Sequence, residues 1–270
     1  MTSVGIKTEL TTTLGISHSN LYYQPLQPAK DLATKIRIEE AWRYHPSYGH
    51  KRLADHLGMG KNRVRRVMLL FGIKPYRRRG KKWHSGATTG VDYPNLIITL
   101  TPLYPGHIWA SDFTYIWFGG AWLYVATIID LYTRKIVGLA ISRSHDRWLV
   151  QTALLDALRY NPRPDYLHSD HGSEYKSRDY QGTVTEVGIT PSMAAKGCPW
   201  ENGYQESFYS QFKIELGDPA RFKSLGELTA TIYKQIHYYN NHRLHTSLNM
   251  APNAFARQYV MLNQVVQKVS

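Results

Sequence analysis

Two apolar segments joined by a pair of glycines restrict most strongly what this chain can fold into. HIWASDFTYIWF (107–118) and AWLYVATIIDLYT (121–133) are rich in β-branched and aromatic residues, and Gly119-Gly120 between them can adopt the positive φ angles of a tight turn. A third segment of the same kind, KIVGLAIS (135–142), follows directly. The sequence therefore predicts three consecutive antiparallel strands.

Helical and strand-like segments alternate after this hairpin. DRWLVQTALLDALRY (146–160) has the apolar spacing of a helix, with Asp146 as its N-cap. DYLHSD (165–170) and GITPSM (188–193) are predicted as further strands, and a long helix begins near Trp200. This order predicts an α/β fold, in which helices cover the faces of a sheet.

The excess of positive charge is concentrated in the first third of the chain. Residues 1–84 contain 17 Lys and Arg against 5 Asp and Glu, whereas the other 186 residues contain 16 against 15. The cations cluster at Lys61, Arg63, Arg65, Arg66, Lys74, Arg77, Arg78, Arg79, Lys81 and Lys82. Such asymmetry is typical of nucleic-acid binding; a solvated surface and an anionic membrane are the alternatives.

The basic third is predicted to be helical. An amphipathic helix is expected over 31–44. Its apolar face would consist of Leu32, Ile36, Ile38, Ala41 and Trp42. HKRLADHL (50–57), the GMG turn and KNRVRRVMLLF (61–71) then follow the order of a helix-turn-helix module. The alternative is an ordinary three-helix bundle.

The last of these helices separates apolar from basic side chains. Val64, Val67, Met68 and Phe71 recur at helical spacing and predict its buried face. We expect the cations off this face to contact DNA, namely Lys61, Arg63, Arg65 and Arg66.

Two segments flank the predicted 31–74 DNA-binding domain. The 1–30 arm contains LGISHSNLYY (14–23), whose opening echoes LGMGKNRVRR (57–66); this is either part of a second helix-turn-helix or a chance similarity. The 75–95 segment reads as a linker that lies along a phosphate backbone, and its expected DNA contacts are Arg77, Arg78, Arg79, Lys81 and Lys82.

Composition excludes several other classes. The single Cys198 rules out an internal disulfide and any zinc site that needs two thiolates, and it fits a reducing compartment. The longest apolar runs have the length of strands and are too short to span a bilayer. We therefore expect a soluble, cytoplasmic protein with no membrane partner.

Three carboxylates stand out in the second part of the chain. Asp112 lies in the middle of an apolar strand, where an unpaired charge is expensive to bury. Asp170 ends a later strand, which is the usual place for sites in open α/β sheets. Glu206 is on a helix and points away from its apolar stripe of Tyr204, Phe208, Phe212 and Leu216. The alternative is that these residues are surface acids or helix caps.

The blocks around these acids resemble the DDE transposase and retroviral integrase superfamily. WASDFTYI, YLHSDHGSEY and KGCPWENGYQESFYSQFKIEL are similar to its three signature blocks, including the 35 residues between Asp170 and Glu206. HPSYGHKRL and YYNNHRLHTSLNMAPNAF resemble blocks of one group of insertion sequences, which encodes its transposase in two overlapping reading frames. Within that group, this chain resembles the product of the second frame. His171, where relatives often carry Arg or Asn, departs from the pattern.

The resemblance implies a ribonuclease H-like core over 96–216, a mixed sheet flanked by helices, and a C-terminal helical extension over 217–270. It implies that Asp112, Asp170 and Glu206 hold two Mg²⁺ ions, with Mn²⁺ as a substitute, and that Lys213 contacts DNA near the cut; the alternative for Lys213 is a solvated side chain. The expected reaction is hydrolysis at the element ends followed by transfer of the 3′-OH into target DNA.

The expected partners are double-stranded DNA at the element ends and the target, further copies of the chain on DNA, and an upstream-frame product. A non-catalytic DNA-binding regulator and a plain ribonuclease are the competing interpretations. The first is disfavoured by the complete carboxylate set and the second by the basic helical module.

Overall fold

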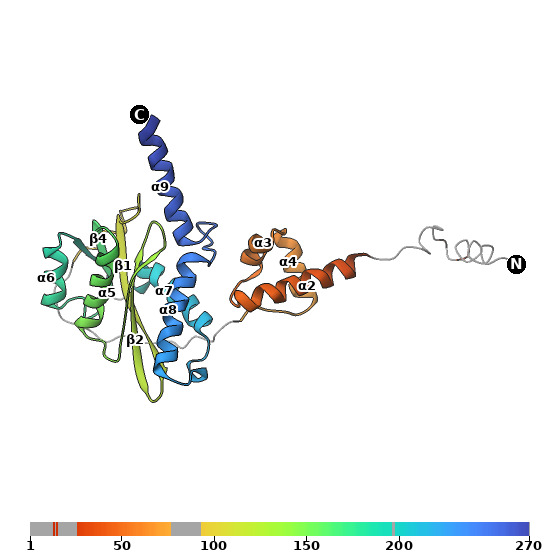
Figure 1. Cartoon of the computed structure of the whole chain (residues 1–270), viewed down its shortest axis with the longest axis horizontal. Helices are drawn as coiled ribbons and strands as arrows, with labels where there is room; N and C mark the ends of the chain where they lie inside the picture. Colours follow the sequence, from red (N-terminus) through yellow and green to blue (C-terminus); the bar gives the residue numbers. More distant parts are fainter. Residues whose placement is uncertain (1–12, 14, 16–25, 77–92, 196–197, 270) are drawn as a thin grey trace. The chain divides into compact units, whose positions relative to one another are not determined.

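The computed structural model describes residues 13, 15, 26–76, 93–195 and 198–269 (Figure 1). They belong to two compact units: unit 1 comprises Met1–Tyr44 and Tyr48–Lys74, and unit 2 comprises His45–Ser47 and Pro75–Ser270. The suggested second helix-turn-helix at 14–23 lies almost wholly outside the described residues, as do Arg77, Arg78, Arg79, Lys81 and Lys82.

Three helices form the described part of unit 1: α2 (Leu26–Tyr44), α3 (His50–Leu57) and α4 (Lys61–Leu70). The predicted second and third helices are confirmed, and the first begins five residues earlier than predicted. Gly58 ends α3 in the left-handed region, with φ 62°, and so permits the sharp turn into α4. Val64 and Val67 of α4 are buried, as expected, whereas Met68 is only partly buried.

The predicted apolar face of α2 is wrong in part. Leu32 and Ile36 are about half exposed, whereas Asp31 and Thr34 are buried beside Ile38 and Ala41. The reason lies on α4. The Arg66 guanidinium donates to both Asp31 carboxylate oxygens at 2.5 and 2.7 Å, and Arg63 donates to the Thr34 hydroxyl. These bonds satisfy the buried polar groups, so the α2–α4 contact is partly ionic.

Unit 2 contains a five-stranded sheet in the order β3-β2-β1-β4-β5. The predicted strands are confirmed with ends shifted by a few residues: β1 (Ile108–Phe118), β2 (Ala121–Asp130), β3 (Ile136–Ser142), β4 (Tyr166–Ser169) and β5 (Thr190–Met193). The first three strands are antiparallel, and β4 runs parallel to β1 and to β5. Gly119 and Gly120 have φ 58° and 79°, so the glycine turn is confirmed.

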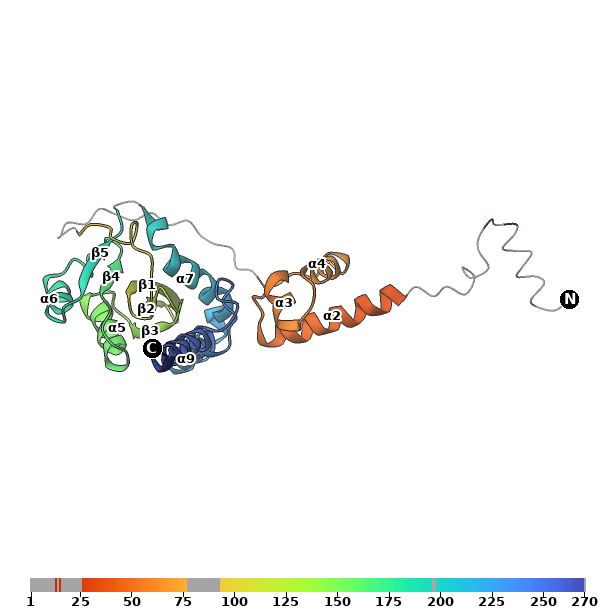
Figure 2. The ribbon, with the colours of Figure 1, turned by 90° about the horizontal axis from the view of Figure 1, so that it is seen from above.

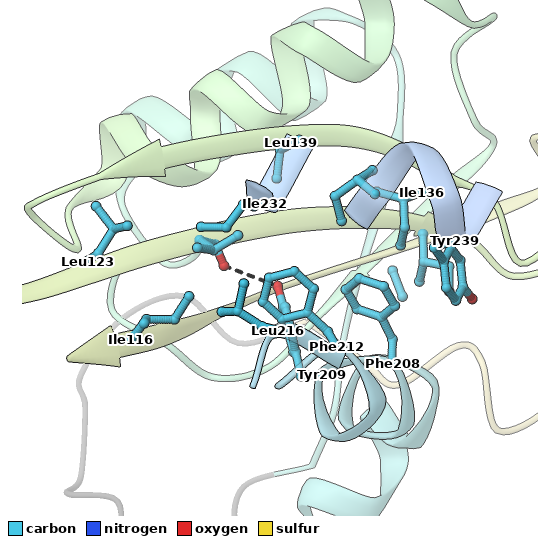
Figure 3. Packing of buried hydrophobic residues seen from close by; sticks show 14 of the residues in the cluster. Ile116, Leu123, Ile136, Leu139, Phe208, Tyr209, Phe212, Leu216, Ile232 and Tyr239 are labelled. Carbon is cyan, nitrogen blue, oxygen red and sulfur yellow. Dashed lines mark hydrogen bonds between the residues drawn. The ribbon is translucent and has the colours of Figure 1, made fainter. Parts of the chain in front are cut away.

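Helices cover both faces of this sheet (Figure 2). α5 (Arg147–Tyr160) and α6 (Arg178–Glu186) enclose one apolar core with the sheet. α7 (Gly203–Leu216) and α8 (Leu225–Asn241) enclose the other (Figure 3). The remaining elements are the short 3₁₀ helices η2 (Pro199–Asn202) and η3 (Pro219–Arg221) and the terminal α9 (Pro252–Val269).

The structure confirms the predicted cap of α5 and differs from the prediction at α6 and α8. Asp146 caps α5 as expected, accepting from the backbone N–H groups of Trp148 and Leu149. α6 was not predicted, because RDYQGTVTE has no continuous apolar stripe. α8 contributes Leu228, Ile232 and other residues to the same core as α7, so part of the predicted C-terminal extension packs against the sheet of unit 2. No described helix is long and apolar enough to cross a membrane.

Candidate active site

The pairing of β1 leaves an open edge at Asp112. β4 pairs with β1 only from Ile108 to Ala110, so from the next residues onward β1 is paired on its β2 side alone. Asp112 lies just past this point, is half-buried, and faces the α7 side of the sheet with Ala110 and Ile116. One carboxylate oxygen accepts from the Phe113 N–H at 2.8 Å.

Asp170 follows directly after β4, the strand beside β1. Its Oδ1 accepts from the Gly172 N–H at 2.9 Å, which ties the carboxylate into its own loop. A Cβ atom on Gly172 would lie 3.0 Å from Asp170 Oδ1 and 2.9 Å from Glu174 Oε2. Glycine therefore lets this loop close around the carboxylate.

Glu206 lies in the first turn of α7 and is exposed. The predicted stripe of this helix is confirmed at Phe208, Phe212 and Leu216, but Tyr204 is 40% exposed. Arg134 lies 4.1 Å from the Tyr204 ring centroid. Glu206 thus points away from the core, as its position on the helix predicted.

Two buried polar residues of α7 fix this helix to the strands. Gln205 donates to the carbonyl oxygens of Ala110 and Thr127, and the Tyr209 hydroxyl donates to the Asp112 carbonyl at 2.7 Å. Burial raises the pKa of Tyr209 well above its usual value, so the hydroxyl keeps its proton and remains a donor. The sequence did not predict a role for Gln205 or Tyr209. Their position beside the apolar stripe of the helix could have indicated that these polar side chains are buried.

The three carboxylates and Lys213 share one electrostatic neighbourhood. Burial, and next the charge of Asp170, raise the pKa of Asp112 well above its usual value; Glu206 adds to this and Lys213 opposes it. Burial likewise raises the pKa of Asp170, with the Gly172 hydrogen bond opposing. Burial is the main cause of both shifts, and the charges of Asp170 and Glu206 raise the pKa of Asp112 further.

The donor set fits a hard divalent cation, because its charged groups are carboxylates only. Within the described residues, no three His, Cys, Asp or Glu side chains are already closed around one point. Asp112 and Asp170 each accept one backbone hydrogen bond, which leaves further oxygen lone pairs. A cation that retains several waters suits such an incomplete set of ligands.

The other acids have structural roles. Asp130 accepts from the backbone N–H groups of Gly106, Tyr132 and Thr133, and burial raises its pKa. Glu201 accepts from Asn95 and from the Ala195 N–H, both at 2.5 Å. Glu215 pairs with Arg243 at 2.7 Å. They hold loops and helices in place.

The histidines near Asp170 give no sign of a metal site. His168 is fully buried and contacts the Ser192 hydroxyl at 3.0 Å. Burial lowers its pKa to about 4, so the ring is neutral near pH 7. His171 is half-buried beside Asp170.

Glu174 is a buried carboxylate that the sequence interpretation did not single out. It contacts the His145 ring at 2.8 Å, and that ring stacks on Phe113, the neighbour of Asp112, with centroids 6.3 Å apart. Glu174 therefore links the Asp170 loop to the segment before α5. A single charged residue in the HGSEY block carried no signal for this contact.

The predicted DNA contacts differ in their surroundings. Lys61 and Arg65 are exposed on α4, whereas Arg63 and Arg66 bond to Thr34 and Asp31. Lys213 Nζ lies 4.9 Å from the centroid of the Tyr115 ring on β1. Lys213 also lies in the electrostatic surroundings of Asp112 and lowers its pKa.

Comparison with known families and proteins agrees with this arrangement. Residues 103–199 and 187–252 match two families, both described as an integrase core domain. The chain is 38% identical over 192 residues to the transposase for insertion sequence element IS904 of Lactococcus lactis, covering 69% of this chain and 76% of that protein. It is 32% identical over 266 residues to a 31 kDa protein of insertion element IS600 from Shigella sonnei, covering 91% and 96%.

Among solved structures, the simian T-cell lymphotropic virus intasome matches with a TM-score of 0.50 at 15% identity, covering 80% of this chain and 73% of that chain. At that identity the likeness concerns the fold, a ribonuclease H-like sheet flanked by helices. Fold and matches together define a polynucleotidyl transferase of the transposase and integrase class. The chain belongs to the bacterial insertion-sequence transposases with an integrase core domain.

Proposed function

We propose that Asp112, Asp170 and Glu206 are the catalytic residues and hold two Mg²⁺ ions, for which Mn²⁺ can substitute. The placement of Asp112 on the open edge of β1, beside the strand that leads into Asp170 and in the electrostatic surroundings of Glu206, supports this most directly. When bound, the ions activate a water or hydroxyl oxygen and stabilise charge on the leaving oxygen. Asp112 would help to hold both ions, and Asp170 and Glu206 would each help to hold one.

The reaction has two chemically similar steps. In the first, water attacks a phosphorus at the element end; the P–O3′ bond breaks and the 3′ oxygen takes up a proton. In the second, that 3′-OH loses its proton and attacks a phosphorus in target DNA, where another P–O3′ bond breaks. The second step forms one phosphodiester for the one that it breaks, so strand transfer needs no nucleotide cofactor.

Residues around the carboxylates position the DNA and the ligands. Lys213 binds a phosphate oxygen near the cut. Gln205 and Tyr209 orient β1 below Asp112 through its backbone carbonyls. Gly172 lets the Asp170 loop approach closely. These are geometric roles, and they complement the electrostatic role of the carboxylates.

Unit 1 supplies sequence-independent and sequence-specific DNA contacts. α3 and α4, separated by the Gly58–Gly60 turn, act as a helix-turn-helix in residues 31–74, with Lys61 and Arg65 as exposed cations. Arg77, Arg78, Arg79, Lys81 and Lys82 extend the contact along the backbone from the 75–95 linker. Arg63 and Arg66 contribute through their partly exposed guanidinium groups while bracing α2.

The active assembly contains further copies of the chain on DNA, acts in the cytoplasm on the nucleoid, and uses the upstream-frame product for full recognition of the element end. The catalytic core spans 96–216, and 217–270 forms the helical extension. The boundary at residue 216 is supported only in part, because α8 follows it but packs into the same apolar core of unit 2 as α7.

The test is a cleavage assay with the full chain. We expect Mg²⁺, the upstream-frame product and a duplex carrying the end of the encoding element to give 3′ nicks and joined strands. Asp112→Asn and Glu206→Gln should abolish both products. Binding without cleavage, with either Mg²⁺ or Mn²⁺ and with the upstream-frame product present, would instead identify a non-catalytic regulator.

A further inference from the structure

The far end of the β1–β2 hairpin carries an exposed row of aromatic rings. Tyr115, Trp117 and Trp122, here called the hairpin strip, lie on the face of the sheet opposite to α7 and α8. Trp117 is 53% exposed and Trp122 42% exposed, and Tyr115 is partly buried. Exposed aromatic clusters of this kind commonly mark interaction sites.

The strip exists because α5 is shorter than the hairpin. α5 packs over Ala126 and Ile128, nearer the other end of β2. In Figure 1 the hairpin continues past α5 to its turn, while α8 follows it on the opposite face. The face with even-numbered β1 residues, including Ile116 and Phe118, is therefore covered and the face with Trp117 is not.

The rings of the strip form one continuous surface. The Trp117 and Trp122 centroids are 4.9 Å apart at 68°, and Tyr115 meets Trp122 at 5.0 Å and 84°. Edge-to-face pairs of this kind fix ring orientation while leaving ring faces accessible. The result is a pre-ordered aromatic surface rather than a set of separate side chains.

The strip and the candidate active site share the open edge of β1. Tyr115 follows Asp112 by three residues on the same strand, so it lies about 10 Å away along β1 and its side chain points to the opposite face of the sheet. Trp117 lies about 7 Å further, the length of about two stacked nucleotides. Lys213, which faces the Tyr115 ring at 4.9 Å, stands at the border between strip and carboxylates.

Aromatic faces next to a cation suit a nucleic-acid strand better than an apolar protein surface. Bases stack on aromatic rings with little sequence preference, and a neighbouring Lys binds the phosphate. Only unpaired bases offer a free face, because bases in a duplex already stack on each other. A strand opened at the cut would present such bases beside Asp112.

We propose that Tyr115, Trp117 and Trp122 form a stacking surface for unpaired DNA bases of a strand that passes from the scissile phosphate, by way of Lys213, around the open edge of β1. This proposal rests on the proposed function in taking DNA as the ligand near Asp112. It adds a preference for an opened DNA end, which the carboxylates alone do not provide.

The experiment measures binding of the full chain without divalent metal, so that no cleavage is needed. Two probes carry the same element end: one is fully paired, and the other has a few unpaired nucleotides at the cut, one of them 2-aminopurine. The variant is the double substitution Trp117→Leu with Trp122→Leu, which keeps apolar area but removes the rings. Tyr233→Leu, an exposed aromatic residue on α8, is the matched control.

We expect the double variant to bind the unpaired probe about tenfold more weakly and the paired probe within about twofold of wild type. Wild type and Tyr233→Leu should quench 2-aminopurine, and the double variant should not. The double Trp→Phe variant should restore the preference, which shows that rings rather than folding are responsible; thermal unfolding checks this independently.

Equal losses on both probes, or no loss on either, would overturn the proposal. A change in sedimentation of the double variant, without a change in probe preference, would assign the strip to contact between copies of the chain and would also overturn it. The catalytic proposal fails separately: Asp112→Asn should keep the probe preference, whereas wild type without nicking in Mg²⁺ would contradict only the catalytic role.

Discussion

Asp112 and Asp130 lie on paired strands, and burial raises the pKa of both, yet their surroundings are opposite. Asp130 accepts three backbone N–H bonds from a loop and a turn. Asp112 accepts one, from its own neighbour, and faces two further carboxylates. A buried acid surrounded by donors stabilises the fold, whereas one facing like charge either keeps its proton or is ionised beside a cation.

Removing the Asp112 carboxylate should have the largest effect. We expect Asp112→Asn to lower nicking by about a thousandfold, several kcal/mol of transition-state stabilisation. Since the substitution also removes a buried repulsion, the melting temperature in metal-free buffer at pH 7 should stay equal or rise. A melting temperature several degrees lower would indicate that Asp112 is a structural residue like Asp130.

Asp130→Ala should show the reverse pattern. Losing the acceptor for three N–H groups should lower the free energy of unfolding by about 3 kcal/mol, measured by urea denaturation. Nicking per folded molecule, measured well below the melting temperature, should remain near the wild-type value. Selective loss of nicking with unchanged stability would place Asp130 in the catalytic machinery.

Gly172→Ala tests the geometry of the Asp170 loop. Its Cβ would lie within 3.0 Å of the Asp170 and Glu174 carboxylate oxygens, so the loop must shift. We expect nicking to fall about tenfold through misplacement of Asp170, with less than about 1 kcal/mol lost in stability. Gly182→Ala, on α6 where a Cβ meets no atom within 4 Å, is the control and should be active.

Asp31 extends the comparison to unit 1, and its effect should be the smallest. The hydrogen bonds from Arg66 lower the pKa of Asp31, so this pair stabilises above the carboxyl's ordinary pKa of 3.8 and the contribution is lost as the pH falls through the lowered value. Asp31→Asn should lower the melting temperature of unit 1 at pH 7 and converge with wild type at strongly acidic pH. A difference independent of pH would show that packing, rather than charge, is responsible.

Most of the fold could be predicted because its strands are locally distinctive. The apolar runs around Gly119-Gly120 and the Asp146 cap gave β1, β2, β3 and α5 to within a few residues. α6 and the buried face of α2 could not be predicted, because each depends on partners remote in sequence. Asp31 is buried only because Arg66 arrives from α4, 35 residues later.

The same distinction applies to the site. Asp112, Asp170 and Glu206 could be proposed from the sequence through strand position, helix faces and the resemblance of three blocks, and their catalytic role stays a prediction. Gln205, Tyr209 and the Glu174–His145 contact were not, since their roles come from hydrogen bonds between elements. Arg63 and Arg66 were predicted as cations for DNA alone, and their bonds to α2 emerged only with the packing of the helices.

The most direct test of the central claim is an anomalous-difference map from crystals of the chain with its element-end DNA and Mn²⁺. We predict two peaks held among Asp112, Asp170 and Glu206, and none in crystals of Asp112→Asn. Peaks bound elsewhere, or no peak at these carboxylates in the wild-type complex, would contradict the account.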